Sequence, residues 1–445
     1  MSQVKSTQAY IIESVIINST RMLEPFDING LVSDIEIFEH IDMPYLTGQV
    51  AFTDTFRLYD RLDFQGAEYC IIKMKQTEKS ESVEKRFVID KLLANKKSNE
   101  QTDLVMFHMV EDILFHSNLQ NVNKAYKGTA SEILKNISKE FLDKKIEDRT
   151  NDIIKKDLKV IIPNLSPLEA MKMMKNRANT QKGYPTYLFS SLTLDRLIYY
   201  DLNQLINGQP FNKSSPFVYG VSNHDMEILG FKHVPIREYS IASTENLYNL
   251  IADGLVGASH QYIDTHLGKQ KIHNFNVVND VFSKILDENI SNKEPNFAQN
   301  FKINGKALQN YSSKKIVQIT ESGAYDDSTN RYSSYNEEAE ASDHAKKIMA
   351  KAFRSFLVKS PITIRIDGAG FIQGGKHYTT GNIARILFLA NRPMSLGDVK
   401  LDLKKSGDYL IYSAKHSFAG TRYNIHLTCV KLTNFTDDNP LKVIG

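Results

Sequence analysis

The sequence predicts a mainly β protein with α+β insertions, and three observations lead to that prediction. Apolar and polar residues alternate with a period of two through residues 1–115, as they do in half-buried strands. Residues 116–215 instead carry amphipathic helices with N-terminal caps. Alternation with a period of two then returns in residues 216–285 and 345–435.

The first block, residues 1–115, contains six strand-like runs. In residues 46–53, Leu46, Val50 and Phe52 lie on one face, and Thr47 and Thr53 lie on the other. Several short strands at this spacing favour an antiparallel barrel or sandwich, and closing the sheet would remove its exposed edges. The other runs are residues 10–17, 32–38, 69–74, 86–92 and 104–110, with Gly30, Gly48 and Gly66 between or within them.

The second block, residues 116–215, begins with helix signals. Thr129 and Glu132 have the spacing of a capping box, and Ser166 and Glu169 repeat it with Pro167 at the first helical position. Two strands joined by a tight turn are expected at residues 185–190 and 195–200. The block therefore predicts an inserted α+β domain.

The third block is split into residues 216–285 and 345–435. Strands are expected at residues 226–231, 238–241, 262–278, 361–368, 384–390, 408–414 and 423–431. A short helix is expected after Ser243, and a helix of ~15 residues after Ser342. Because this block is as rich in strands as the first, it suggests a second barrel that is related to the first one.

Residues 286–344 differ in composition from both β blocks. They are rich in Asn, Ser, Lys and Glu, and between Glu321 and Asp343 the only base is Arg331. Such a segment cannot bury a core of its own, which favours a surface loop or linker that ends at the start of a helix. Residues 436–445 form a C-terminal tail.

Composition excludes several classes of protein. The 445 residues include 55 Lys and Arg against 52 Asp and Glu, a formal charge of +3 that gives no global attraction to nucleic acid. Cys70 and Cys429 match no metal or redox spacing and are expected to be buried thiols in a reducing compartment. No run approaches the ~18 apolar residues that span a bilayer, and the polar start is unlike a signal peptide. We therefore expect a soluble protein without a membrane span.

Motifs that could carry chemistry are weak. Residues 368–374 resemble a dinucleotide-binding loop, but the third glycine comes one residue late and no helix follows. Residues 220–224 resemble a nucleophile elbow around Ser222, except that His224 stands where glycine is required. A glycine-rich hairpin or bulge beside a strand and a polar turn are the favoured interpretations.

Histidines and basic residues also give no recognisable site. His260, His266 and His273 lack metal-ligand spacing and are expected at a surface or interface. A basic cluster is interleaved with acids, which indicates a salt-bridged helical surface rather than a phosphate site; its members are Lys135, Lys139, Lys144, Lys145, Arg149, Lys155 and Lys156. We therefore predict no catalytic, cofactor-binding or metal-binding residue, no cofactor, and a protein that is not an enzyme.

Three groups of motifs resemble the central baseplate hub protein of contractile-tailed bacteriophages, which is related to the hub part of type VI secretion spikes. The first group is INGLV (residues 28–32), IEIFEHI (35–41), PYLTGQVAFTD (44–54) and FQGAE (64–68). The second is PNLSPLEA (163–170) with YLF (187–189). The third is SGDYLIY (406–412), HSF (416–418) and YNI (423–425).

This resemblance implies a homotrimer in which two barrels per chain give a pseudo-sixfold ring. Such a ring would join the sixfold tail tube to the threefold central spike and enclose a channel for DNA. The implied partners are the spike protein, the tail tube or tube-initiator protein, the tape-measure protein and baseplate wedge components. DNA would pass only in transit, so we expect a channel without a strong Lys/Arg lining. The implied location is the baseplate of the virion tail, assembled in the host cytoplasm.

Other functions stay open at this point. The chain could be the hub of a bacterial contractile injection system, and neighbouring capsid and terminase genes would favour a phage instead. A tail-associated cell-wall hydrolase would need paired acids or a nucleophile and base in a cleft. A carbohydrate-binding adhesin is disfavoured because the sequence has no Trp.

Overall fold

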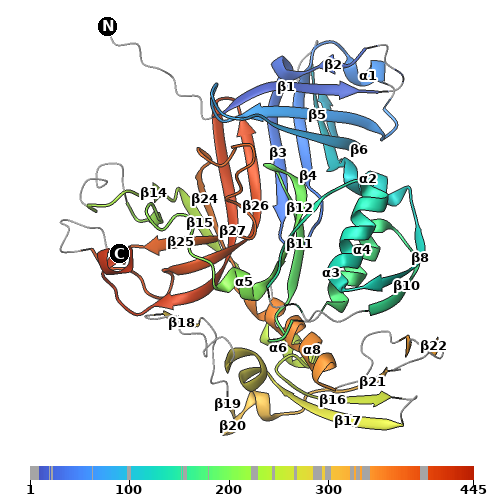
Figure 1. Cartoon of the computed structure of the whole chain (residues 1–445). Helices are drawn as coiled ribbons and strands as arrows, with labels where there is room; N and C mark the ends of the chain where they lie inside the picture. The colour runs from blue at the N-terminus through green and yellow to red at the C-terminus, as the bar shows by residue number, and fades with distance from the viewer. Residues whose placement is uncertain are drawn as a thin grey trace.

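The structure is a computed structural model that describes most of residues 10–444 (Figure 1). The residues outside the description are 1–9, 20, 22–23, 63, 98–101, 152, 154–157, 179, 222–228, 243–245, 265–267, 284–292, 296–301, 321–324, 327–330, 333–340, 391–398 and 445. The predicted mainly β fold class with an α+β insertion is confirmed, because two β-rich halves are joined to an α+β unit that the chain inserts between them. The two predicted barrels are instead two halves of one 15-stranded sheet, whose pairings among the described residues close neither half.

The N-terminal half forms a sheet with the order β3-β4-β7-β6-β5-β1-β2. Each strand-like run of the first block forms a strand, and β6 extends beyond its run at both ends because it forms a long hairpin with β7. The elements are β1 (Ile11–Asn18), β2 (Phe26–Asp27), η1 (Asn29–Leu31), β3 (Val32–His40), β4 (Thr47–Asp54), α1 (Leu58–Leu62), β5 (Glu68–Lys75), β6 (Val83–Lys97) and β7 (Asp103–Glu111).

The inserted unit follows β7 directly. In the capping box of α3, the Glu132 amide donates to Thr129 Oγ1 and the Glu132 carboxylate accepts from the Thr129 amide. At α4, the Glu169 carboxylate accepts from both the amide and the hydroxyl of Ser166. The elements are α2 (Asp112–Asn118), β8 (Val122–Gly128), α3 (Ala130–Ile137), η2 (Ser138–Leu142), β9 (Ile146–Arg149), β10 (Leu158–Leu165), α4 (Pro167–Arg177), β11 (Thr186–Ser191), β12 (Leu194–Asp201) and α5 (Leu202–Ile206).

The C-terminal half is built mainly from two long strands and their neighbours. β26 and β27 form a hairpin, β27 pairs with β24, and β24 pairs with β15. Of the strand predicted at residues 226–231, positions 226–228 lie outside the described residues. The elements are β13 (Phe217–Tyr219), β14 (Val234–Pro235), β15 (Glu238–Ile241), β24 (Ile362–Asp367), β25 (Ile383–Phe388), β26 (Gly407–Ala419), β27 (Arg422–Phe435) and α9 (Pro440–Ile444).

The chain between β15 and β24 contains more structure than its composition predicts. Within the stretch predicted as loop, Lys315–Thr320 forms β21, which pairs in parallel with β16. Ile316, Val317, Ile319 and Thr320 are β-branched, and β16 offers them a free edge. The elements are α6 (Leu247–Ala252), β16 (Gly257–Asp264), β17 (Lys269–Asn276), η3 (Val278–Phe282), β18 (Lys293–Pro295), β19 (Lys302–Ile303), β20 (Lys306–Ala307), η4 (Leu308–Asn310), β21, β22 (Tyr325–Asp326), β23 (Arg331–Tyr332) and α8 (Ala341–Leu357).

The two halves repeat the same strand arrangement. The chain order β3, β4, β5, β6, β7 corresponds to β15, β24, β25, β26, β27, and both sets have the same order in the sheet, with β5 or β25 at one end and β3 or β15 at the other. The correspondence ends beyond β5 and β25, since β1 pairs with β5 antiparallel whereas β13 pairs with β25 in parallel.

The two halves also share one sheet. Residues 34–40 of β3 pair antiparallel with residues 413–419 of β26, so the hydrogen bonding continues from one half into the other (Figure 1). Beneath this junction lies a common core that includes Ile35, Ile37, Ala414, Phe418 and Ile425, all buried. The halves are therefore fixed relative to each other.

Candidate functional site

The largest candidate site is the polar face of the shared sheet. In β3, β24, β26 and β27, buried residues alternate with half-exposed ones, and the registers keep the half-exposed side chains in rows. One row crosses seven strands from β7 to β15 and consists of Val110, Thr47, Phe38, Lys415, His426, Arg365 and Glu238. The next row consists of His108, Gln49, Glu36, Ser417, Asn424 and Asp367.

The charges on this face balance each other. Lys415 Nζ lies 2.7 Å from Glu36 Oε1, and Arg365 Nη2 lies 2.5 Å from Glu238 Oε1. Burial, together with the neighbouring Lys415 and Arg365, lowers the pKa of His426, so this imidazole is neutral at pH 7. The face therefore offers hydrogen-bonding groups without a positive field.

A shallow pocket of about 480 Å³ lies on this face where the two halves meet. Its walls come from β3 and β4 on one side and from β24, β26 and β27 on the other. The lining residues include Phe38, His40, Thr47, Thr363, Ser413, Lys415, His426 and Thr428. This mixture of hydroxyl, imidazole and ammonium groups contains no activated nucleophile.

Behind the sheet, the buried carboxylate of Glu39 connects three parts of the chain. It accepts from the Leu192 amide (2.6 Å) in the β11–β12 turn and from the Thr379 hydroxyl (2.5 Å). His416 Nε2 of β26 lies 3.4 Å away. Burial raises the pKa of Glu39, but His416, His377 and Thr379 outweigh burial and hold this pKa well below its usual range.

Two further carboxylates fix the inserted unit to the N-terminal half. The Asp42 carboxylate, in the β3–β4 turn, pairs with the buried Lys175 ammonium of α4 and lies 3.8 Å from Arg354 Nη1 of α8. The Glu111 carboxylate accepts from the Ser190 hydroxyl at 2.9 Å and lies 3.5 Å from Lys85 Nζ. Burial lowers the pKa of Lys175, and the pairing with Asp42 opposes that shift only in part.

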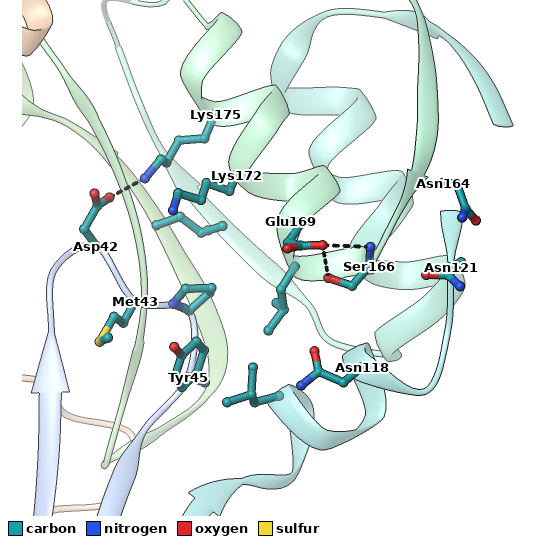
Figure 2. A pocket seen from close by; sticks show the side chains of 14 residues that line it. Asp42, Met43, Tyr45, Asn118, Asn121, Asn164, Ser166, Glu169, Lys172 and Lys175 are labelled. Atoms are coloured by element: carbon teal, nitrogen blue, oxygen red, sulfur yellow. Dashed lines mark hydrogen bonds and ion pairs between the residues drawn. The ribbon is translucent and has the colours of Figure 1, made fainter. Parts of the chain in front are cut away.

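A pocket of about 530 Å³ lies beside the Asp42–Lys175 pair (Figure 2). Figure 2 shows Met43 and Tyr45 of the β3–β4 turn on one side and Lys172 of α4 on the other. Three amide side chains, those of Asn118, Asn121 and Asn164, surround its far end. These groups can hydrogen-bond a ligand or a neighbouring chain, but none of them is a nucleophile beside a base.

One buried cluster contains the residue types of a hydrolytic triad. Ser191 Oγ lies 2.8 Å from His377 Nδ1, and Glu39 is 3.4 Å from the same hydroxyl. His377 Nε2 lies 2.6 Å from the Thr380 carbonyl oxygen, and Ser191 is completely buried. This burial shields the hydroxyl from solvent, and its contacts with Glu39 of β3 and with His377 join the inserted unit to the shared sheet.

The structure places the glycine-rich motif beside β24 as a turn. A Cβ on Gly368 would lie 2.2 Å from the ring of Tyr423, so glycine is required there for close packing. The amide of Gly370 donates to Gln76 Oε1 at 3.0 Å. The predicted position beside a strand is correct, but the motif forms a turn after β24 rather than a hairpin or bulge. In the other motif, residues 220–224, Gly220 has a φ of 96° and Ser222 lies outside the described residues.

The expectation for the histidines is wrong for His260. Its side chain is only 3% exposed, and it lies directly opposite His273 in the β16–β17 hairpin. The pairing register, which the spacing alone does not give, brings the two residues together. His266 lies outside the described residues. Within the described residues, no group of three or more His, Cys, Asp or Glu side chains is arranged to hold a metal ion.

Three members of the basic cluster form ion pairs. Lys135 lies 2.9 Å from Asp148, Lys144 lies 2.7 Å from Asp195, and Arg149 Nε lies 2.5 Å from Glu147. Lys144 and Arg149 stand after the helices rather than on them. Cys70 and Cys429 are buried thiols, as predicted, and burial raises the pKa of Cys70 to about 12. No described helix is long and apolar enough to cross a membrane.

Comparison with known proteins gives matches in structure only. No protein-family model and no curated protein sequence matches the chain. The 43 kDa tail protein of prophage MuSo2 from Shewanella oneidensis matches with a TM-score of 0.52 and 10% identity, over 94% of this chain and 98% of that one. The tail protein from Neisseria meningitidis MC58 matches with a TM-score of 0.50 and 11% identity, over 95% and 97%.

A type VI secretion component from E. coli matches more weakly, with a TM-score of 0.42 and 7% identity over 95% of this chain and 76% of that one. The two tail proteins are matched along nearly their whole length. The chain therefore has the fold of phage tail proteins. The resemblance to a baseplate hub protein is confirmed at the level of the fold.

The sequence prediction missed the three carboxylates at the junctions. Glu39 follows Ile35 and Ile37 on the same face of β3, so the period of two already placed an acid on the buried face. His416 lies likewise between Ala414 and Phe418 on the buried face of β26. A polar residue at a buried position of an alternating strand is a usable signal for such a junction.

Proposed function

We propose that this chain is a non-enzymatic structural hub of the baseplate in a contractile phage tail. Three copies form a ring in which six related half-sheets surround a central channel. The proposal is supported by the repeated halves that share one sheet, in a chain with the fold of tail proteins. The ring adapts the sixfold tail tube to the threefold spike.

In this role the chain contacts its own copies, the central spike protein and the tail tube or tube-initiator protein. The tape-measure protein and then DNA pass through the channel, and wedge components bind outside. We assign the chain to the baseplate of the virion tail, with assembly in the host cytoplasm. The two halves correspond to residues 1–115 and to residues 216–285 with 345–435, and residues 116–215 form the inserted domain.

The polar face of the shared sheet is the surface that we assign to the channel. DNA that must pass through should not be held, and a face whose cations are paired with acids meets that requirement. A cryo-EM map of the ring tests this assignment. We expect the polar rows through Lys415 and Arg365 on the inner wall; an inner wall with rings of unpaired Lys and Arg would contradict it.

Mass measurement in solution tests the assembly. We expect a trimer for the purified chain, alone or after addition of the candidate spike protein. A chain that remains monomeric, or that forms dimers or tetramers, under both conditions would rule out the hub. Muralytic activity of the purified chain on peptidoglycan would instead support a tail-associated hydrolase.

A further inference from the structure

The junction between the two halves has a defined geometry inside one chain. Along one edge, β26 pairs with β25 up to Leu410 and then, after a bulge between Ile411 and Ser413, with β3. Thus β3, the end strand of the N-terminal half, pairs with the part of β26 that lies nearest the turn of the β26–β27 hairpin.

The equivalent hairpin of the N-terminal half has the same bulge. β6 pairs with β5 up to Ile89, and a bulge follows between Ile89 and Lys91. β6 has a second bulge between Leu92 and Ala94, where the equivalent part of β26 is regular. The buried pairs Val50–Phe107 and Phe52–Val105 match Ile364–Leu427 and Ile366–Ile425, which fixes the correspondence residue by residue. Lys91 of β6 therefore corresponds to Ser413 of β26.

Beyond the bulge, the two hairpins differ in what lies beside them. In β26 the edge is covered by β3, whereas among the described residues no strand pairs with the same edge of β6 from Lys91 to Lys97. β15, the equivalent of β3, likewise pairs only with β24 within the described part of the chain. Each chain thus has two unpaired strand edges among its described residues, one on β15 and one on β6. They are equivalent to the edges of β3 and β26 that pair with each other inside the chain.

We infer that β15 of one copy pairs antiparallel with the distal part of β6 in the next copy, and so repeats the β3–β26 junction between chains. This inference deepens the proposed function, because it names the surface through which the copies join. Glu36 pairs with Ser417 in the internal junction, and their equivalents are Ser240 and Lys96. Ser240 of one copy therefore lies opposite Lys96 of the next.

The side chains on the two edges fit this pairing. Ile37 in β3 is completely buried, while its equivalent in β15, Ile241, is 52% exposed and lacks the cover that a second hairpin would give. Leu93 in β6 is 43% exposed. In the proposed ladder, Lys96 and Lys97 lie near Glu238 of β15, which within the chain pairs with Arg365.

The position of the edges favours a ring rather than a twofold dimer. β15 and the β6 hairpin lie on opposite sides of the β3–β26 junction (Figure 1). Two different surfaces that pair head to tail form a ring when the rotation closes, and each added copy covers an edge that would otherwise invite aggregation. The polar rows then continue from chain to chain.

Disulfide trapping tests the register. Residues directly opposite in an antiparallel ladder have Cβ atoms about 5 Å apart, which suits a disulfide. We expect Ser240→Cys with Lys96→Cys to give covalent dimers and trimers under mild oxidation. Ser240→Cys with Lys91→Cys is the matched control, because that pair is displaced by four ladder positions, or roughly 13 Å. The native thiols are buried and do not compete.

The outcomes separate this inference from the proposed function. A trimer by mass that does not cross-link through Ser240→Cys and Lys96→Cys, or that cross-links equally in the control, would overturn the inference. The proposed hub function would still stand in that case. Self-cross-linking of Ser240→Cys alone would also overturn it, because that result requires a twofold contact. A monomer at every concentration would overturn both.

A second variant tests the contact without oxidation. Ile241→Asp places a charge in the proposed ladder at a side chain that is exposed in the single chain. We expect the mass to fall from trimer to monomer while the thermal unfolding of the single chain is unchanged. A trimer of undiminished stability in this variant would contradict the proposed contact.

Discussion

Asp42 binds cations from two later parts of the chain, Lys175 and Arg354. Asp42→Asn would leave the buried Lys175 ammonium without its carboxylate. Because the Asp42 side chain is itself partly exposed, we expect a loss of about 2–3 kcal/mol in the free energy of unfolding, measured by urea denaturation. Asp42→Asn combined with Lys175→Met should recover most of this loss; no recovery would show that the ion pair is not the cause.

His260 gives the small β16–β17–β21 sheet a dependence on pH. Burial, with a smaller effect of His273, lowers the pKa of His260 to about 4, whereas in the unfolded chain it is near 6.5. Between pH 6.5 and pH 4, the unfolded chain therefore binds a proton at His260 more readily than the folded chain does. This contribution to stability is complete above pH 6.5 and falls as the pH drops from about 6.5 to 4.

The corresponding test is His260→Phe, which keeps a ring against Phe275 and removes the titration. Between pH 7 and pH 4 the natural chain should lose up to about 3 kcal/mol more than the variant. Hydrogen exchange of the β16 and β17 amides measures the difference. Equal acid sensitivity in both proteins would contradict the assignment.

At the scale of the elements, the β3–β26 ladder depends on the buried Glu39. Glu39→Gln removes the charge that His416 and His377 stabilise, and we expect a loss of about 2–3 kcal/mol at pH 7. Because the pKa of Glu39 is lowered, the effect should shrink as the pH falls below the usual value of about 4.5.

Glu36→Gln is the matched control for this change. Glu36 lies three residues earlier on the polar face, where its ion pair with Lys415 is partly exposed. We expect the control to change the free energy of unfolding by less than about 1 kcal/mol. Equal losses in the free energy of unfolding of the two variants, measured by urea denaturation, would show that Glu39 stabilises the protein no more than a carboxylate on the polar face does.

The strands and caps could be predicted from the sequence because their signals are local. Leu46, Val50 and Phe52 alternate within eight residues, and the capping box of α3 lies within one turn, from Thr129 to Glu132. The pairing of β3 with β26 could not be predicted, since it joins residues 34–40 with residues 413–419. The sequence of neither strand indicates its partner, and the contact between Glu39 and His416 depends on that pairing.

The prediction of a loop was wrong at residues 315–320, because the strand there forms by pairing with a distant part of the chain. Lys315 and Val317 of β21 are exposed, and the strand forms by pairing with the edge of β16. The contact between His260 and His273 could not be predicted either, because it depends on the register of the β16–β17 pairing.

At the scale of the whole molecule, the account depends on the repeat. Five strands of each half follow the same order along the chain and in the sheet, and one half continues into the other through β3 and β26. A chain that already contains two related units can present six of them in three copies, and an inserted unit held by buried carboxylates keeps its place outside the shared sheet. This arrangement is what a hub between sixfold and threefold partners requires.

A cryo-EM reconstruction of the assembled particle tests this central claim most directly. The account predicts three chains around one axis, six half-sheets at nearly equal angles, and β15 of each chain beside β6 of the next. A particle with an even number of chains, or one in which only a single half-sheet of each chain faces the axis, would contradict it.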